Sequence, residues 1–256
     1  MAALITGGAV RLGRAMALHL AARGHDVAVH YASSEGPALA VVAEARALGV
    51  KAVALQADLL DFAAVEALVP RAAEALGKPL DVLVNNASIF EYDTLEAATA
   101  ESWARHVDSN LRAAVFLTQA FAAQAPATGS DGEPLAMANV VNMIDQRVRK
   151  PTPEFMTYSI AKAGLWAFTK TAAQALAPQI RVNGIGPGPT LQGTRQTEEH
   201  FANQRKATIL RRGSGPEEIC RALDFILDSP GFTGQLLCMD GGQHLAWQTP
   251  DILGPE

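Results

Sequence analysis

The sequence predicts an α/β fold of the Rossmann type, in which a doubly wound, seven-stranded parallel sheet forms a single domain over residues 1–256. Short β-rich runs alternate with longer helical patterns, and several of these runs are apolar almost throughout. Uniformly apolar strands are typical of parallel sheets that helices cover on both faces. A chain of 256 residues that is 49% hydrophobic is long enough to bury such a core.

The alternation allows each element to be placed in order. The expected strands are Ala2–Thr6, Asp26–Tyr31, Lys51–Gln56, Asp81–Val84, Leu135–Met143, Ile180–Ile185 and Gln235–Met239. The intervening segments are long enough for crossover helices, for example over 11–23 and 38–48, and Gly49 suits the left-handed turn after the second helix. Residues 125–134 carry Pro, Gly, Ser and Asp without periodicity, which predicts a loop in solvent.

Residues 190–208 break this rhythm, because polar side chains follow a Gly-Pro-Gly turn. We expect a mobile lid over a substrate in this segment. An exposed helix pair is the alternative.

Charge and composition exclude several classes of partner. The formal net charge of -5 offers no basic surface for nucleic acid. The sequence has no run of eighteen apolar residues that would span a membrane and no signal-peptide pattern after Met1, so we expect a cytoplasmic protein that acts on a small molecule. Cys220 and Cys238 are interpreted as buried free thiols, and the scattered histidines have no metal-ligand spacing.

A glycine-rich turn, Thr6-Gly-Gly-Ala-Val-Arg-Leu-Gly13, follows the first strand and opens a helix. In that context backbone N–H groups and the helix N-terminus can approach a pyrophosphate, and Arg11 adds a fixed positive charge. We therefore expect a dinucleotide to be bound here by Gly7, Arg11, Leu12 and Gly13.

The end of the second strand bears on the choice between NAD and NADP. A carboxylate there would bind the ribose hydroxyls of NAD, but the chain reads His30-Tyr31-Ala-Ser33-Ser34. The hydroxyls of Ser33 and Ser34 suit a 2′-phosphate, so we expect NADP, with His30 and Tyr31 also at the cofactor. Serines that cap the next helix are the alternative, and both roles can hold at once.

Polar residues also follow the third and fourth strands. Asp58 and Leu59 would hold the adenine edge, unless Asp58 only caps the following helix. Asn86, Ala87 and Ser88 would line the ribose side, because a polar pair at the end of an apolar strand needs partners.

Tyr158 and Lys162 lie four residues apart, and therefore on one face of a helix. A phenol and an ammonium would reach the same small volume there, as a proton donor and a group that lowers its pKa. Asp145 stands thirteen positions before Tyr158, where a ketone reductase would carry a serine. An ionised carboxylate repels the charge that builds on a ketone oxygen, but it accepts the N–H donors of a nitrogen heterocycle.

These motifs together resemble the short-chain dehydrogenase/reductase family over residues 3–245. The resemblance is carried by the glycine-rich turn, Asn85-Asn86-Ala87, Asn110, Tyr158-x-x-x-Lys162, Pro187-Gly188 and Asp240-Gly-Gly. Within the family the details are similar to pteridine reductases and dihydromonapterin reductases. The shared details are Arg11 where most members have glycine, Ser88, Phe90, and Asp145 in place of serine.

The resemblance implies a role for each of these residues. Tyr158 would donate the proton, Lys162 would bind the nicotinamide ribose and lower the pKa of the tyrosine, and Asn110 would support a water-linked proton path. Asp145 would complete the catalytic group. The implied contacts are Arg11 with cofactor phosphate and substrate, Ser88 with pterin or cofactor, Phe90 stacked on the pterin ring, and Met143, Pro187 and Gly188 with the cofactor. Phe90 as an ordinary core aromatic is the alternative.

We therefore expect an NADPH-dependent reductase that transfers hydride to a ring C=N bond of a pterin, and the resemblance implies a homotetramer. Reduction of a carbonyl or another imine at the same Asp145 site is one alternative. An NADP-binding sensor or scaffold without turnover is another, although binding alone does not need a proton donor.

Overall fold

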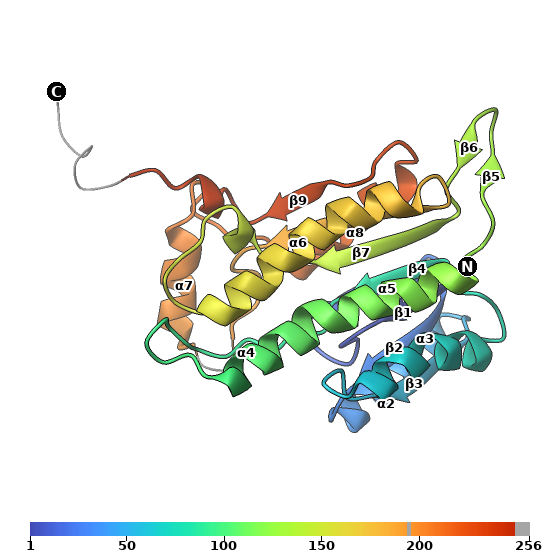
Figure 1. The fold of residues 1–256 in the computed structure, drawn as a ribbon, viewed down its shortest axis with the longest axis horizontal. Coiled ribbons are helices and arrows are strands. Elements are labelled where there is room, and N and C mark those ends of the chain that lie inside the picture. Colours follow the sequence, from blue (N-terminus) through green and yellow to red (C-terminus); the bar gives the residue numbers. More distant parts are fainter. Residues whose placement is uncertain (194–195, 249–256) are drawn as a thin grey trace.

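The computed structural model describes residues 1–193 and 196–248, so positions 194 and 195 of the expected lid lie outside the described residues. Figure 1 shows the arrangement of the helices and strands. The elements are β1 (Ala2–Ile5), α1 (Arg11–Ala22), β2 (Asp26–Tyr31), α2 (Glu35–Ala47), β3 (Ala52–Gln56), α3 (Phe62–Leu76), β4 (Val82–Asn85), α4 (Ala100–Val107), α5 (Ala113–Gln124), β5 (Gly129–Ser130), β6 (Pro134–Leu135), β7 (Ala138–Met143), α6 (Met156–Leu176), β8 (Ile180–Pro187), α7 (Glu198–Lys206), α8 (Pro216–Asp228) and β9 (Leu236–Met239).

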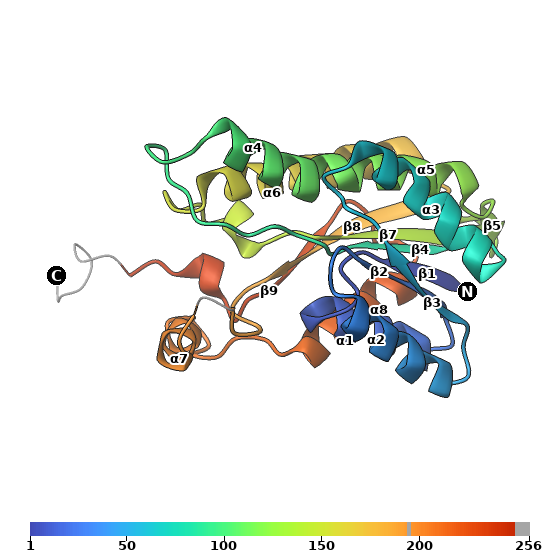
Figure 2. The ribbon, with the colours of Figure 1, turned by 90° about the horizontal axis from the view of Figure 1, so that it is seen from below.

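Seven parallel strands form one sheet in the order β3-β2-β1-β4-β7-β8-β9, which confirms the expected fold class. Figure 2 shows α3, α4, α5 and α6 on one face of the sheet and α1, α2 and α8 on the other. The strand order reverses between β1 and β4. In open sheets of this kind, ligands bind at that switch point, beyond the carboxyl ends of the strands.

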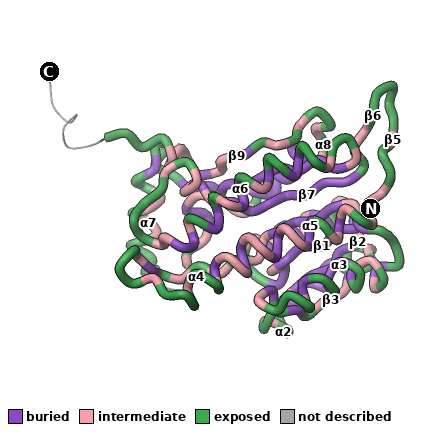
Figure 3. Tube along the Cα trace, viewed as in Figure 1, coloured by how far each residue is buried: buried purple, intermediate pink, exposed green. Residues whose placement is uncertain are grey.

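Strands such as β1 are apolar throughout because they supply two cores. Along β1, Ala3 and Ile5 pack into one buried cluster with residues of α1, α2 and α8. Ala2 and Leu4 point the other way, into a cluster with α3, α5 and α6. The alternation follows from the two-residue period of a strand. Figure 3 shows the resulting band of buried backbone through the centre of the molecule.

The expected boundaries agree with the structure to within two residues, except for two that differ by three. The fifth sheet strand begins at Ala138 rather than Leu135, because 129–135 folds back into the β5–β6 hairpin inside the expected loop. Gly132, with φ +115°, permits that reversal. Helix α2 begins at Glu35 instead of Ala38, since Pro37 falls in the first turn, where a missing N–H costs nothing. Gly49 has the expected positive φ, +89°.

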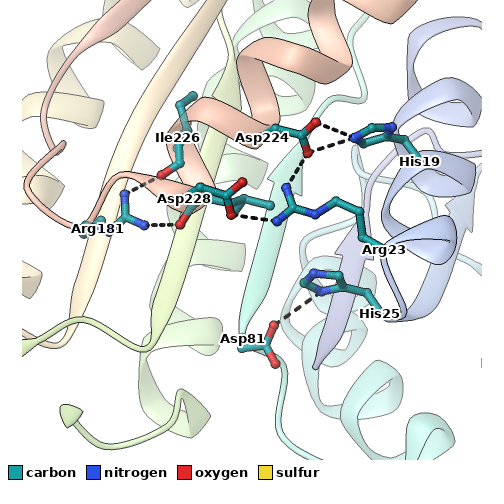
Figure 4. Close-up of polar contacts among 9 residues, drawn as sticks. His19, Arg23, His25, Asp81, Arg181, Asp224, Ile226 and Asp228 are labelled. Atoms are coloured by element: carbon teal, nitrogen blue, oxygen red, sulfur yellow. Dashed lines mark hydrogen bonds and ion pairs between the residues drawn. The ribbon is translucent and has the colours of Figure 1, made fainter. Parts of the chain in front are cut away.

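Polar contacts bind α1 to α8 at the amino ends of the strands, away from the switch point (Figure 4). Arg23 bridges Asp224 and Asp228, with 2.6 Å from Nη2 to Asp228 Oδ1. In the same region the buried His25 lies 3.7 Å from Asp81. This end of the sheet provides a reference region for testing the site at the other end.

Within the described residues, no helix has both the length and the apolar character needed to cross a membrane. Cys220 and Cys238 are free thiols. The expectation that both are buried is wrong for Cys238, which is only partly buried because β9 is the edge strand.

Candidate active site

A cleft of about 430 Å³ opens at the carboxyl ends of the strands, at the switch point. Many of the expected cofactor residues line it: Gly7, Arg11, Leu12, Gly13, His30, Asp58, Leu59, Asn86, Ala87, Ser88 and Gly188. Other lining residues were not among the expected cofactor residues: Val10, Ala32, Leu60, Ile89, Ser109, and Thr190 and Leu191 of the expected lid. Most of these are neighbours of expected residues, so the fold adds them by placing whole loops at the cleft.

The glycine-rich turn is shaped by close backbone contacts. A Cβ atom on Gly13 would lie 2.0 Å from the carbonyl oxygen of Gly7, and Gly7 itself has a φ of +60°. Asn86 stabilises the turn, because its Nδ2 donates to the carbonyl oxygens of Thr6 and Gly7 at 2.8 and 3.2 Å. The hydrogen-bond partners expected for Asn86 at the end of this strand are therefore backbone carbonyl groups of the glycine-rich turn.

His30 supports the same turn from β2. Its Nδ1 accepts the N–H of Gly7 at 3.0 Å, and its Nε2 lies 3.0 Å from the carbonyl oxygen of Ala57. Both contacts are made only by the neutral ring with its hydrogen on Nε2. Burial lowers the pKa of His30 to about 4, which keeps that form at neutral pH.

The start of α1 is suited to an anion. Val10 at the N-cap makes no side-chain hydrogen bond to the helix, and the first turn carries no acidic residue. The first N–H groups of the helix and its dipole therefore favour a negatively charged ligand in the cleft. With the glycine turn, this arrangement fits the pyrophosphate of a dinucleotide.

Arg11 adopts a left-handed backbone conformation, with φ +54°, although it has a side chain. Its guanidinium donates to the carbonyl oxygens of Gln192 at 2.6 Å and Leu191 at 3.1 Å. Arg11 therefore links the glycine-rich turn to the segment expected to form a lid. Within that segment, α7 forms an exposed helix with no buried residue.

The residues expected near the adenosine take different positions. Ser33 is exposed, and Ser34 stands at the N-cap of α2 without a side-chain hydrogen bond to that helix. The side chain of Asp58 accepts the N–H of Leu60 at 3.0 Å, and the cap of α3 is Asp61. Asp58 therefore does not cap α3. Tyr31 packs against the core on the α1 side of the sheet.

Tyr158 and Asp145 form a hydrogen-bonded pair. The phenolic hydroxyl donates to Oδ2 of Asp145 at 2.9 Å, while Oδ1 accepts the N–H of Arg147 at 2.8 Å. Burial raises the pKa of Asp145 above its ordinary value. Burial, followed by the negative charge of Asp145, raises the pKa of Tyr158 well above 10, whereas Ser88 lowers it.

Lys162 lies on the same face of α6, one turn after Tyr158, as the spacing predicts. Its Nζ donates to the carbonyl oxygen of Met143 at 2.7 Å and lies 5.7 Å from the centre of the Tyr158 ring. Burial lowers the pKa of Lys162 to about 8. The net effect on Tyr158 is opposite to the expected lowering of its pKa: burial and Asp145 raise that pKa, and the groups that lower it are Arg147 and Ser88.

Asn110 belongs to a π-helical turn, Asp108–Arg112, between α4 and α5. Its side-chain amide exchanges two hydrogen bonds with the backbone of Ile89, both at 2.8 Å. Asn110 therefore holds the loop that carries Ser88 and Phe90. Short π-helical segments are frequent at functional sites, because they re-aim one side chain within a helix.

Phe90 is 46% exposed, so it is not a core aromatic. Its ring stacks on Phe155 with 4.2 Å between centroids and meets the Tyr158 ring edge-on at 4.6 Å. Phe155 was not expected at the site from the sequence, nor were the buried side chains of Asp93, His106 and Thr157 behind it. None of these belongs to a motif, and Asp93 is far from α6 in sequence.

Comparisons with known proteins agree with this geometry. The sequence model of the short chain dehydrogenase family matches residues 1–204. The structure of FolM alternative dihydrofolate reductase 1 from Brucella canis, complexed with NADP, is 40% identical with a TM-score of 0.91, and the match covers 98% of this chain and 96% of that one. Two curated relatives are an L-rhamnose 1-dehydrogenase (NAD(P)(+)) from Sphingomonas, 32% identical over 96% of each chain, and a 3-oxoacyl-[acyl-carrier-protein] reductase from Synechocystis, 36% identical over 94% of this chain and 95% of that one.

Proposed function

The chain belongs to the short chain dehydrogenase family, and we propose that it is an NADPH-dependent reductase acting on a ring C=N bond of a pterin. The glycine-rich turn, the uncapped start of α1 and the cleft at the switch point would hold the cofactor. The NADP named in the Brucella structure supports the choice of dinucleotide.

The observation that carries the proposal is the hydrogen bond from Tyr158 to a carboxylate. A ketone that receives a hydride develops negative charge on oxygen, which an ionised Asp145 would repel. A C=N bond receives hydride on carbon and a proton on nitrogen, and pterins carry N–H groups that a carboxylate accepts. Asp145 therefore favours the nitrogen heterocycle over the ketone.

Each side chain then has its own role in the reaction. NADPH, when bound, supplies the hydride to the ring carbon. Tyr158, whose raised pKa keeps the phenol protonated at neutral pH, hands its proton to the ring nitrogen. Asp145 orients the phenol and accepts substrate N–H groups. Lys162 supplies a positive charge below its pKa of about 8. It would bind the nicotinamide ribose of the cofactor.

The walls of the site would select the substrate. The exposed face of Phe90 offers a platform for a flat ring next to Tyr158. Residues 190–208, which Arg11 links to the glycine-rich turn, would form the lid over that ring. Ser33 and Ser34 would contact the 2′-phosphate, and Asp58 the adenine. The homotetramer and the cytoplasmic location stay predictions.

Reduction of a carbonyl is the second candidate. The names of the Sphingomonas and Synechocystis relatives, one acting on a sugar and one on an oxoacyl group, favour it. The two candidates differ in what they require of Asp145, since only the pterin reaction benefits from the carboxylate.

The test is to follow loss of NADPH absorbance with dihydrobiopterin, dihydromonapterin and dihydrofolate, and with a panel of ketones in parallel. Turnover restricted to the pterins supports the proposal. Turnover of ketones alone contradicts it and supports the second candidate. Tight NADPH binding without oxidation by any substrate would instead favour a sensor or scaffold.

A further inference from the structure

A buried polar network lies behind Tyr158, at the start of α6. Asp93 is 3% exposed, and His106 and Thr157 are fully buried. Asp93 accepts twice from Thr157: its Oδ1 takes the N–H at 3.2 Å, and its Oδ2 takes the hydroxyl in a short hydrogen bond. Its backbone carbonyl oxygen accepts the N–H of Phe155 at 2.8 Å.

Asp93 thereby replaces the cap that α6 lacks. Phe155 occupies the N-cap position in a left-handed conformation, with φ +55°, and its side chain makes no hydrogen bond to the helix. The N–H of Thr157 in the first turn is instead satisfied by a carboxylate from a loop 64 residues away in sequence. A negative charge at this end also stabilises the helix dipole.

The hydrogen bond between His106 and Thr157 has only one possible donor. Its Nε2 accepts the N–H of Glu91 at 3.0 Å, so the ring hydrogen sits on Nδ1, which lies 2.7 Å from the Thr157 hydroxyl. His106 then donates to Thr157, and Thr157 donates to Asp93. Removal of the threonine hydroxyl therefore takes the Thr157 acceptor away from His106 Nδ1. It also removes the short hydrogen bond to Asp93 Oδ2, which keeps only the longer contact with Ser102 Oγ at 3.4 Å.

The network connects the two walls of the candidate active site. Thr157 immediately precedes Tyr158, and the His106 ring lies edge-on to the Tyr158 ring with 6.1 Å between centroids. On the other side, Asp93 holds Phe155, whose ring stacks on Phe90. A shift of the loop relative to α6 would therefore change the distance between the Phe90 platform and the phenol.

We propose that Asp93, Thr157 and His106 form one positioning unit that sets Tyr158 against the Phe90–Phe155 ring pair and so admits a flat heteroaromatic ring at the distance needed for proton transfer. This inference rests on the proposed function, because it takes Tyr158 as the proton donor. The three residues act through Tyr158 and Phe90 and need not contact the substrate.

The first test compares Thr157→Val with Thr157→Ser. Valine keeps the shape but removes the hydroxyl, whereas serine keeps the hydroxyl. For Thr157→Val we expect kcat with a dihydropterin to fall roughly 10- to 100-fold, because small misplacements of reacting groups have effects of that size. The NADPH Kd should stay within about twofold, since the cofactor cleft is not touched. Thr157→Ser should recover most of the lost kcat.

Asp81→Asn is the matched control. Asp81 is a partly buried aspartate that also accepts a distant backbone N–H, that of Ala2 at 2.9 Å, but it lies at the opposite end of the sheet. This variant should change the melting temperature without changing kcat. If it lowers kcat as much as Thr157→Val does, the effect is general destabilisation and the proposal is wrong. Wild-type kcat in Thr157→Val, or equal loss in valine and serine variants, also overturns it.

A second variant and a second substrate cover the cases in which Thr157→Val does not fold or the pterins are not reduced. If Thr157→Val does not fold, Asp93→Asn replaces it, because the amide keeps one acceptor for the Thr157 N–H and loses the acceptor for its hydroxyl. If the wild type reduces only ketones, the proposed pterin function has failed. The ratio of wild-type kcat to Thr157→Val kcat, measured with the ketone that the enzyme turns over, then still tests the positioning of Tyr158. A ratio near one rejects that positioning.

Discussion

Tyr158 donates its phenolic hydrogen to Asp145 across 2.9 Å, from a buried tyrosine to a partly buried aspartate. The two side chains therefore titrate as a unit. The negative charge of Asp145 keeps the phenol protonated, and the phenol is one of the donors that stabilise the carboxylate.

Replacing the carboxylate should separate pterin from ketone chemistry. For Asp145→Ser we expect kcat/KM with a dihydropterin to fall by about 100-fold or more, because the group that orients the Tyr158 phenol and accepts substrate N–H groups is lost. NADPH affinity should be retained. Asp145→Asn keeps the shape and removes the charge, so the pKa of Tyr158 should drop and the alkaline limb of the pH–rate profile should move to lower pH. Undiminished pterin turnover in Asp145→Ser would show that the carboxylate has no such role.

The buried charge of Lys162 should lower the free energy of unfolding, although the reaction needs this residue. Its pKa is lowered from an ordinary 10.5 to about 8 by burial. The folded protein therefore binds fewer protons than the unfolded chain between those values, and stability should rise with pH through that window. The shift corresponds to about 3 kcal/mol against folding at neutral pH. Lys162→Met should consequently unfold at a higher urea concentration than wild type at pH 7, yet show no turnover.

The same variant loses its advantage as the solution becomes alkaline, because wild-type Lys162 is then neutral. Urea midpoints at pH 7 and pH 10 provide the comparison. A Lys162→Met protein that is less stable than wild type at pH 7 would mean that the contact with Met143 outweighs the cost of burying the charge.

His30 should make cofactor binding and stability sensitive to acid. Its pKa is lowered to about 4, so the folded state binds fewer protons than the unfolded chain between about 4 and 6.5. The stability from the neutral ring is present above that window and is lost as the pH falls through it. His30→Gln should flatten this part of the stability profile and weaken NADPH binding roughly tenfold, because one hydrogen bond to Gly7 is lost.

His25→Gln is the control for His30. The pKa of His25 is also lowered to about 4 by burial, but His25 lies at the opposite end of the sheet. This variant should flatten the acid dependence of stability and leave the NADPH Kd unchanged. Equal loss of NADPH affinity in both variants would mean that His30 has no specific effect on the glycine-rich turn.

Arg11 combines backbone strain with a link to the expected lid. Arg11→Gly should relieve about 1 kcal/mol of left-handed strain. Arg11→Ala keeps the strain and should be the less stable variant. Both lose the hydrogen bonds to the carbonyl oxygens of Leu191 and Gln192, so both should show a higher KM for the substrate. Both should also show faster exchange of the adjacent Gly193 N–H, which donates to Oε1 of Gln196 at 2.8 Å. Unchanged exchange there would contradict the link.

Ser33 tests the choice of cofactor. Ser33→Asp places a carboxylate where it repels a 2′-phosphate and can accept from ribose hydroxyls, so the NADPH-to-NADH ratio of kcat/KM should fall by roughly tenfold or more. Ser130→Asp adds the same charge at an exposed serine of the β5–β6 hairpin and should leave that ratio unchanged. If the two variants behave alike, Ser33 does not contact the 2′-phosphate.

The sequence alone determined the fold class and the end of the sheet where the site lies. Apolar runs such as β1 indicate a sheet covered on both faces, because alternate side chains such as Ala3 and Leu4 enter opposite cores. The glycine-rich turn and the Tyr158–Lys162 spacing were visible because their partners lie within a few residues of one another. Local geometry alone then places the groups together.

Only the tertiary structure decided which groups are paired and how they ionise. The cap of α6 by Asp93, the bonds of Asn110 to Ile89, and the contact of His30 with Gly7 join residues that are distant in sequence. Their meeting depends on the crossovers between strands, and no short pattern encodes it. The raised pKa of Tyr158 likewise follows from burial, which depends on the packing of several elements around one side chain.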